Sequence, residues 1–174
     1  MFPAPPHDAH LKTIGVDPHD PNKIYASVEQ GGLFRSADAG KSWEAFPVVD
    51  PDVHRVAIPS ANPKRILATT GMGAFLSIDD GANWKNLSDA DPGALGKIGY
   101  PDLMTINPHD ERLVFIAGAQ TIPPRWPELT ASPKVARSRD GGDSWEILTN
   151  GLPDPSPANF EAMAHESWQG GSAV

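Results

Sequence analysis

Five residues with acid, base or ligand chemistry recur at matched positions along the sequence. They are His10, the pair Asp52 and His54, and the pair Tyr100 and Asp102, each pair separated by one residue. Alternate residues of a strand lie on one face, so each pair would project from the same side of an extended segment. Imidazoles and carboxylates that converge can supply an acid and a base or bind a divalent metal.

These residues support two interpretations. In the first, Asp52 and Asp102 form a catalytic carboxylate pair like that of glycoside hydrolases, while His10, His54 and Tyr100 bind the ligand. In the second, they are only the polar wall of a wet channel. Since the sequence has no His-x-His or His-Glu-x-x-His spacing, we assign no metal site and no cofactor.

A second candidate binding feature is a proline-rich insertion at residues 120–134. It is too rich in proline for a helix and too long for a hairpin turn. Arg125 and Trp126 offer a fork of hydrogen-bond donors beside a flat ring, a combination that recognises sugars, peptides and carboxylates. The alternative is a lid that packs on the rim of the fold.

The composition excludes several functions. The chain has 174 residues, 14 Lys and Arg against 22 Asp and Glu, a net charge of -8, and no cysteine. The negative charge argues against nucleic acid and anionic membranes as partners, and no apolar run reaches the roughly 20 residues of a membrane span. Disulfides and thiolate sites are excluded. Without a signal segment we expect a cytoplasmic chain; a truncated N-terminus would allow a secreted or periplasmic protein.

An internal repeat defines the elements that must position these residues. Three boxes share five positions in register, and each follows a turn at 17–23, 59–64 or 107–111. Their tryptophans lie 41 and 61 residues apart, so a unit of about 40 residues carries one insertion of about 20. The matched residues of the boxes are Ser36, Asp38, Gly40, Ser42 and Trp43; Ser77, Asp79, Gly81, Asn83 and Trp84; and Ser138, Asp140, Gly142, Ser144 and Trp145.

Each unit contains four short β-type runs, which predicts four-stranded propeller blades and few helices. Strands are expected at 11–16, 24–29, 33–37 and 42–47; at 53–58, 66–70, 74–78 and 84–87; at 103–106, 113–117, 135–139 and 145–148; and at 160–164. The corresponding organisation is a connection at 1–10, blades at 11–47, 48–88 and 89–149 with long loops at 89–101 and 120–134, and the start of an incomplete fourth blade at 150–174.

The boxes resemble the Asp-box, or BNR, repeats of sialidase-like β-propellers. The resemblance implies an all-β arc of four-stranded antiparallel blades, in which each box closes the hairpin between the third and fourth strands and its tryptophan packs beneath. Asn83 replaces the usual hydroxyl residue. Propellers typically have four to eight blades, so we expect this chain to be a fragment of a longer propeller, with self-association through its open blade faces as the alternative.

The resemblance also implies two functions. One is an exo-acting, sialidase-like glycoside hydrolase, but the Arg-Ile-Pro motif is absent and only Tyr25 and Tyr100 offer a tyrosine. The other is a binding scaffold similar to the BNR-like proteins of bacteria and to photosystem assembly factors. We favour the scaffold, whose glycan, small-molecule or protein partner would bind the pore-side face, the end of the inner strands opposite the boxes.

Overall fold

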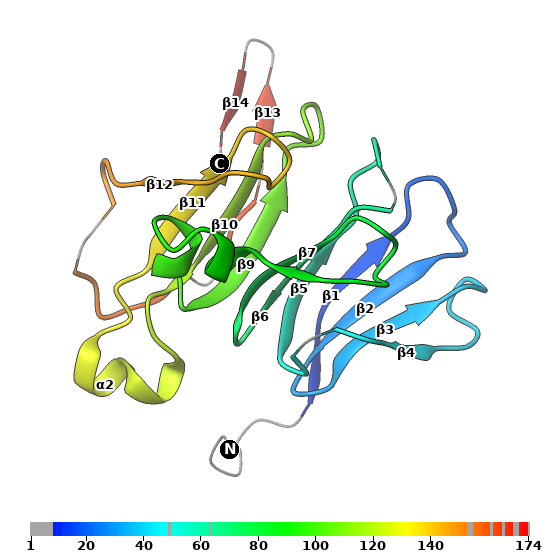
Figure 1. Cartoon of the computed structure of the whole chain (residues 1–174), viewed down its shortest axis with the longest axis horizontal. Helices are drawn as coiled ribbons and strands as arrows, with labels where there is room; N and C mark the ends of the chain where they lie inside the picture. The colour runs from blue at the N-terminus through cyan, green and yellow to red at the C-terminus, as the bar shows by residue number, and fades with distance from the viewer. Residues whose placement is uncertain are drawn as a thin grey trace.

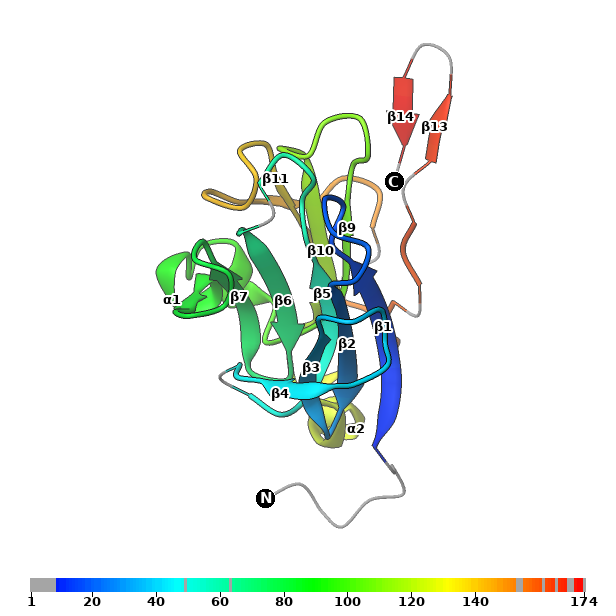
Figure 2. The ribbon, with the colours of Figure 1, turned by 90° about the vertical axis from the view of Figure 1, so that its right-hand side faces the viewer.

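The computed structural model describes residues 9–48, 50–62, 64–152, 155–160, 162–164, 166–168 and 171–173. It contains three antiparallel four-stranded sheets, each built from strands that are consecutive in the sequence. Figure 1 shows the three sheets side by side in chain order, and Figure 2 shows the same arrangement from the side. The all-β prediction is confirmed.

The first sheet comprises β1 (His10–Val16), β2 (Ile24–Glu29), β3 (Gly32–Ser36) and β4 (Glu44–Phe46). The second comprises β5 (Val53–Ala57), β6 (Ile66–Thr70), β7 (Gly73–Ser77) and β8 (Lys85–Asn86). The third comprises β9 (Tyr100–Ile106), β10 (Val114–Ala119), β11 (Lys134–Ser138) and β12 (Glu146–Leu148). The outermost strands β4, β8 and β12 are shorter than predicted.

Two apolar clusters hold the sheets together. Tyr25 and Leu33 of the first sheet pack with Val53 and Ile66 of the second. Residues of the second and third sheets form the other cluster, and β5 contacts both β1 and β9. Burial of these faces supplies the main stabilisation between sheets. The second cluster contains Leu67, Leu76, Leu87, Leu95, Ile98, Val114 and Ile116.

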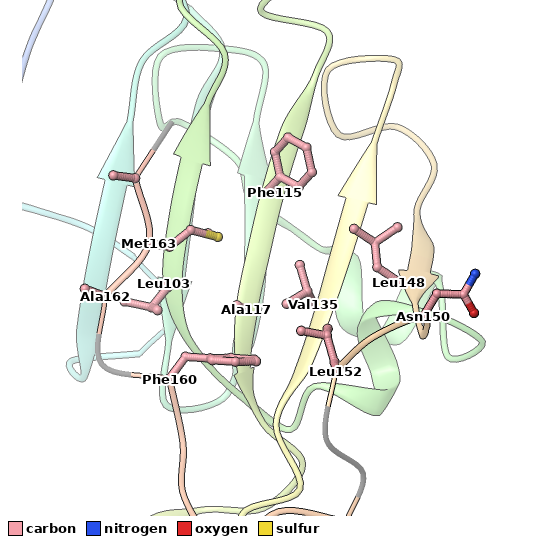
Figure 3. Close-up of a pocket in the computed structure, with 11 residues that line it drawn as sticks. Leu103, Phe115, Ala117, Val135, Leu148, Asn150, Leu152, Phe160, Ala162 and Met163 are labelled. Carbon is pink, nitrogen blue, oxygen red and sulfur yellow. The ribbon is translucent and has the colours of Figure 1, made fainter. Parts of the chain in front are cut away.

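The outer sheets each keep an apolar surface. On β1, the side chains of Leu11, Ile14 and Val16 are more than half exposed. On the third sheet, a hollow of about 390 Å³ lies between the strands and the later segment that carries Phe160 and Met163, as Figure 3 shows. Its lining includes Leu103, Phe115, Ala117, Val135, Leu148, Leu152, Phe160 and Met163.

The boxes close their hairpins through one repeated set of hydrogen bonds. In the first box, the Ser36 hydroxyl donates to Asp38 and accepts from the Gly40 amide at 2.8 Å. Asp38 also accepts from the amide and the hydroxyl of Ser42. The other two boxes repeat this arrangement, and in the second the Asn83 side-chain amide donates to Asp79 at 2.7 Å. Asparagine therefore does the work of the usual hydroxyl.

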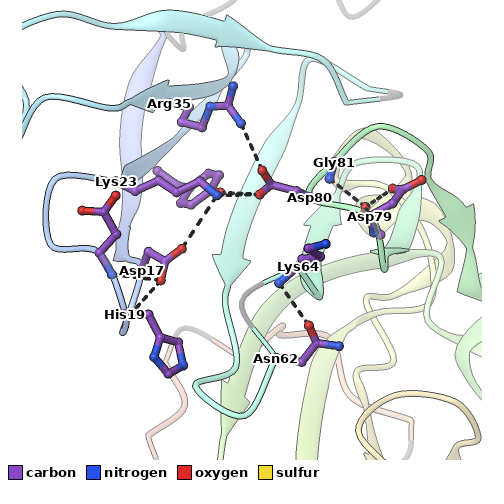
Figure 4. A network of polar contacts seen from close by, with 12 residues as sticks. Asp17, His19, Lys23, Arg35, Asn62, Lys64, Asp79, Asp80 and Gly81 are labelled. Atoms are coloured by element: carbon purple, nitrogen blue, oxygen red, sulfur yellow. Dashed lines mark hydrogen bonds and ion pairs between the residues drawn. The ribbon is translucent and has the colours of Figure 1, made fainter.

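Each of the later boxes also bonds to the preceding sheet. Asp80, in the second box, lies 2.7 Å from the Lys23 ammonium and 3.6 Å from the Arg35 guanidinium, both on the first sheet (Figure 4). In the same way, Arg65 of the second sheet donates to the Gly141 carbonyl of the third box at 2.9 Å. The boxes thus fix each sheet against its neighbour as well as closing a hairpin.

The prediction that every box tryptophan packs beneath its hairpin needs correction. Trp84 and Trp145 are partly buried against the preceding sheet, but Trp43 is 44% exposed. The described residues provide no sheet ahead of the first one, so the Trp43 ring lacks the packing that Trp84 and Trp145 receive from a preceding sheet. Trp84 also donates to the carbonyl of Pro47 in the preceding sheet, whereas Trp43 donates to Gly40 of its own box.

The structure has few and short helices, as expected, but two finer expectations are wrong: an insertion without a helix and a strand at 160–164. Short helical turns form at α1 (Leu87–Ala90), η1 (Leu95–Lys97), η2 (Pro123–Arg125) and α2 (Trp126–Leu129), the last two within the insertion judged too rich in proline. Proline is tolerated there because it occupies the first turn, where its missing N–H has no helical partner.

The described residues within 160–164 form no strand. The strands beyond them are β13 (Glu166–Trp168) and β14 (Gly171–Ala173), which pair with each other. None of the helices in the described residues has the length and apolar character to span a membrane.

Candidate functional site

The site lies at the pore-side ends of the inner strands, and three β-bulges position it. The register of β1, β5 and β9 shifts between neighbouring pairs, at Lys12, His54 and Asp102 respectively. A bulge redirects its side chain away from the regular alternation of the strand. The three side chains meet as a result: Asp102 Oδ1 lies 3.6 Å from Lys12 Nζ and 4.0 Å from His54 Nδ1.

His54 occupies the centre of the group. Its side chain is fully buried, its Nδ1 lies 2.8 Å from the Pro101 carbonyl, and its Nε2 lies 3.5 Å from Asp52 Oδ2. Because a carbonyl can only accept, Nδ1 carries the hydrogen of that bond. Burial by itself would lower the pKa of His54, but Asp52, the Pro101 carbonyl and Asp102 outweigh it and raise the pKa.

Asp52 is held just ahead of β5 and is 2% exposed. Its amide donates to Asp50 at 3.1 Å, and a Cβ on Gly71 would stand 2.5 Å from its Oδ2, so only glycine leaves room for the carboxylate. Burial opposes ionisation of Asp52, but His54 and hydrogen bonds from Gln30 outweigh it, so the pKa of Asp52 is lowered. The two shifts have a common cause, because the Asp52 carboxylate and the His54 ring lie close together where little water reaches them.

A more exposed rim surrounds this pair. Glu29 Oε2, at the end of β2, lies 2.9 Å from Lys12 Nζ and 3.1 Å from His10 Nε2. The side chains of Glu29, Lys12 and Asp102 are each about one-fifth exposed or less, while that of His10 is half exposed. Solvent therefore reaches the group through the rim.

Two aromatic contacts in series connect the site to the insertion. The Tyr100 ring lies 4.6 Å from that of His54, and the Trp126 ring meets Tyr100 edge-on at 6.4 Å. Trp126 Nε1 donates to the Thr121 carbonyl at 2.7 Å. Burial, followed by the charges of the four surrounding carboxylates, strongly raises the pKa of Tyr100, which stays protonated. These carboxylates are Asp52, Glu29, Asp102 and Asp50.

The structure brings together His54, Asp52, Tyr100 and Asp102, with His10 on the rim. Arg125 is exposed on the insertion and is not part of this group, while Trp126 serves to anchor the insertion rather than to offer a free ring. Sequence reasoning missed two contributors, Glu29 and Asp50. Only Asp50 carried a signal, since it lies two residues before Asp52.

One subset of the site has the composition of a metal site. Glu29, Asp52 and His54 each offer one ligand atom, and these atoms lie within 4.8 Å of one another. Two polar atoms of these residues, Asp52 Oδ1 and His54 Nε2, are buried and have no hydrogen-bond partner among the described residues. Carboxylates with an imidazole suit divalent transition metals.

Comparison with solved structures decides the fold. No protein-family model matches the sequence, and curated proteins provide no match. Similar structures are an ancestral GH74 enzyme (TM-score 0.62, 19% identity), YCF48 from Cyanidioschyzon merolae (0.54, 21%) and a chain of a nidogen/laminin complex (0.59, 14%). They align with 79%, 87% and 82% of this chain. The chain has the fold of a β-propeller arc.

The arc is only part of each of these proteins. It spans 18% of the GH74 enzyme, 40% of YCF48 and 49% of the nidogen/laminin chain. At these identities the likeness concerns the fold alone, and one fold can serve many functions. The site of this arc must therefore decide its function.

Proposed function

We propose that this arc belongs to an Asp-box propeller that acts as a rigid binding scaffold for a protein partner. The observation that carries the proposal is the position of His54. Its buried ring lies between the two candidate catalytic carboxylates, with Nε2 towards Asp52 and Nδ1 towards Asp102. A glycosidase pair must flank the bond of a bound sugar, and here the imidazole fills that space.

The electrostatics of the site also favour the scaffold. A general acid in glycoside hydrolysis needs a raised pKa so that it keeps its proton near neutral pH. The pKa of Asp52 is lowered instead, because His54 and Gln30 outweigh the effect of burial. Asp52 would be ionised and already paired, so it is a poor proton donor.

The binding surface we propose is the insertion and the adjoining rim. The Trp126 ring against Tyr100, and its bond to Thr121, fix the insertion before any partner arrives. The Gln120 amide also donates to the Ala131 carbonyl at 2.8 Å and closes the base of the loop. A preorganised loop loses little entropy on binding, and its exposed Arg125 provides a charged contact.

The comparisons support a protein partner. One of the similar YCF48 structures holds a D1 peptide, and another similar chain comes from a complex of nidogen with laminin. An ancestral GH74 enzyme is also similar, so hydrolysis is the alternative function to be tested.

The experiment has two arms. In the first, the protein is incubated with xyloglucan and with aryl glycosides and sialosides; we expect no turnover, and turnover that Asp102→Asn abolishes would establish the hydrolase. In the second, peptides selected from a displayed library are titrated against the protein. Arg125→Ala should weaken binding about tenfold, since it removes a charged contact. Arg112→Ala, an exposed arginine at the box end, is the matched control; equal losses in both variants would refute the proposed surface.

A further inference from the structure

The group of side chains around His54 contains buried polar atoms that accept or donate no hydrogen bond among the described residues. Asp52 and His54 are almost completely buried, yet Asp52 Oδ1 and His54 Nε2 have no hydrogen-bond partner among the described residues. Leaving a buried polar atom unpaired is energetically unfavourable, so such atoms point to something that binds there.

The orientation of His54 is that of a metal ligand. Its Nδ1 donates to the Pro101 carbonyl at 2.8 Å, and this bond leaves Nε2 facing Asp52, whose Oδ2 lies 3.5 Å away. Metal-binding histidines almost always donate their second N–H to a carbonyl or carboxylate, which fixes the ring and the tautomer. Gly71 adds to this positioning, because any side chain there would displace the Asp52 carboxylate.

We propose that Glu29, Asp52 and His54 bind one divalent transition-metal ion, with Zn²⁺ as the best-suited probe. The ligand atoms lie within 4.8 Å of one another, close to the sum of two metal–ligand bonds of roughly 2.0–2.5 Å. Two carboxylates and one imidazole leave further coordination positions for water. Glu29 lies on the partly exposed rim and provides the path of entry.

Lys12 makes the proposal specific. Its ammonium lies 2.9 Å from Glu29 Oε2 and 3.6 Å from Asp102 Oδ1, so it neutralises the same carboxylate that the metal needs. His10 Nε2 also contacts Glu29 at 3.1 Å. A divalent ion must therefore compete with the Lys12 ammonium for Glu29, and removal of that ammonium should strengthen metal binding.

This inference goes beyond the scaffold proposal and does not depend on it, because it involves neither Arg125 nor a partner. Untagged protein is treated with EDTA, passed through gel filtration and titrated with ZnCl₂ in a calorimeter. A parallel titration with Co²⁺ records the visible absorption bands of the bound ion. We expect one ion per chain, with a Zn²⁺-dependent rise in melting temperature that EDTA reverses.

Three variants test the ligand set. Glu29→Gln, on the rim, should lower the affinity about tenfold or more, since a carboxylate ligand is lost. Lys12→Met should raise the affinity, a gain that misfolding cannot imitate. His109→Gln, an exposed histidine at the opposite end of the inner strands, should leave it unchanged. No binding at about 1 mM Zn²⁺, or an affinity that Glu29→Gln leaves intact, would overturn the proposal.

Discussion

The packing between the first two sheets can be tested by comparing Gly81 with Gly40. The two glycines occupy the same position in their boxes and have nearly identical φ angles of +83° and +84°. A Cβ at Gly81 would overlap the ring of Phe46, whereas at Gly40 the nearest atom is 3.7 Å away in Trp43. Since the backbone is the same, the difference between the two alanine variants measures the contact with Phe46.

The expected losses follow from these contacts. An alanine forced into the left-handed region costs roughly 1–2 kcal/mol, which is the loss we expect for Gly40→Ala. Phe46 cannot withdraw easily, because its ring packs edge-on against Tyr25 at 5.4 Å and Trp84 at 6.5 Å. Overpacking of such a site adds about 1–3 kcal/mol, so Gly81→Ala should lose about 2–5 kcal/mol.

Urea unfolding followed by far-UV circular dichroism measures both losses. A Phe46→Leu background completes a double-mutant cycle, since leucine lacks the outer ring atoms that the new Cβ would meet. Gly81→Ala should then cost no more than Gly40→Ala, which corresponds to a coupling of about 1–3 kcal/mol. Equal losses at the two glycines in the native background would refute the close packing of Gly81 against Phe46.

Three further predictions concern the boxes and the insertion. The free energy of unfolding should fall as the pH drops from about 4 to about 2. Box hydrogen bonds lower the pKa of Asp38 to about 2, and at Asp140 they outweigh burial with the same result. This contribution is complete above the unfolded value of 3.8 and is lost on protonation; urea unfolding at several pH values tests it, and an Asn variant at both positions should flatten the fall. Trp84→Ala should cost about 2–4 kcal/mol of unfolding free energy and the exposed Trp43→Ala about 1 kcal/mol. Equal melting temperatures of the two variants would contradict the deeper burial of Trp84. Trp126→Ala should speed hydrogen exchange of amides 121–130 without unfolding the sheets, and unchanged exchange would show that the ring is not the anchor.

The sequence predicted the sheets well because each box carries its own structural information. An aspartate, a hydroxyl or amide, and a glycine in fixed register determine a tight hairpin locally. The short helix α1 was missed, although it too has a local signal. The Asn86 side chain caps α1 by accepting from the Ser88 and Asp89 amides, a signal that was present in the sequence. The exposure of Trp43 could not be predicted, because it depends on which neighbouring sheet is present.

The candidate site was only half predictable. The repeat aligns Lys12, His54 and Asp102, and the structure places all three at corresponding bulges. Glu29 was not predicted because it belongs to the second strand, and its position beside His10 and Lys12 depends on the pairing of β1 with β2. That pairing brings Glu29 directly opposite His10, a relation that no spacing within one strand reveals.

His54 links the two proposals while leaving them separable. Its ring separates Asp52 from Asp102, which argues against a hydrolytic pair, and its Nδ1 bond to Pro101 directs Nε2 into the proposed metal site. The scaffold proposal is tested at Arg125, on an insertion held by Trp126, and the metal proposal is tested at Glu29. A chain that binds Zn²⁺ but loses nothing with Arg125→Ala would keep the metal site and reject the surface. The opposite result would show a scaffold whose buried pair serves only to hold the inner strands together.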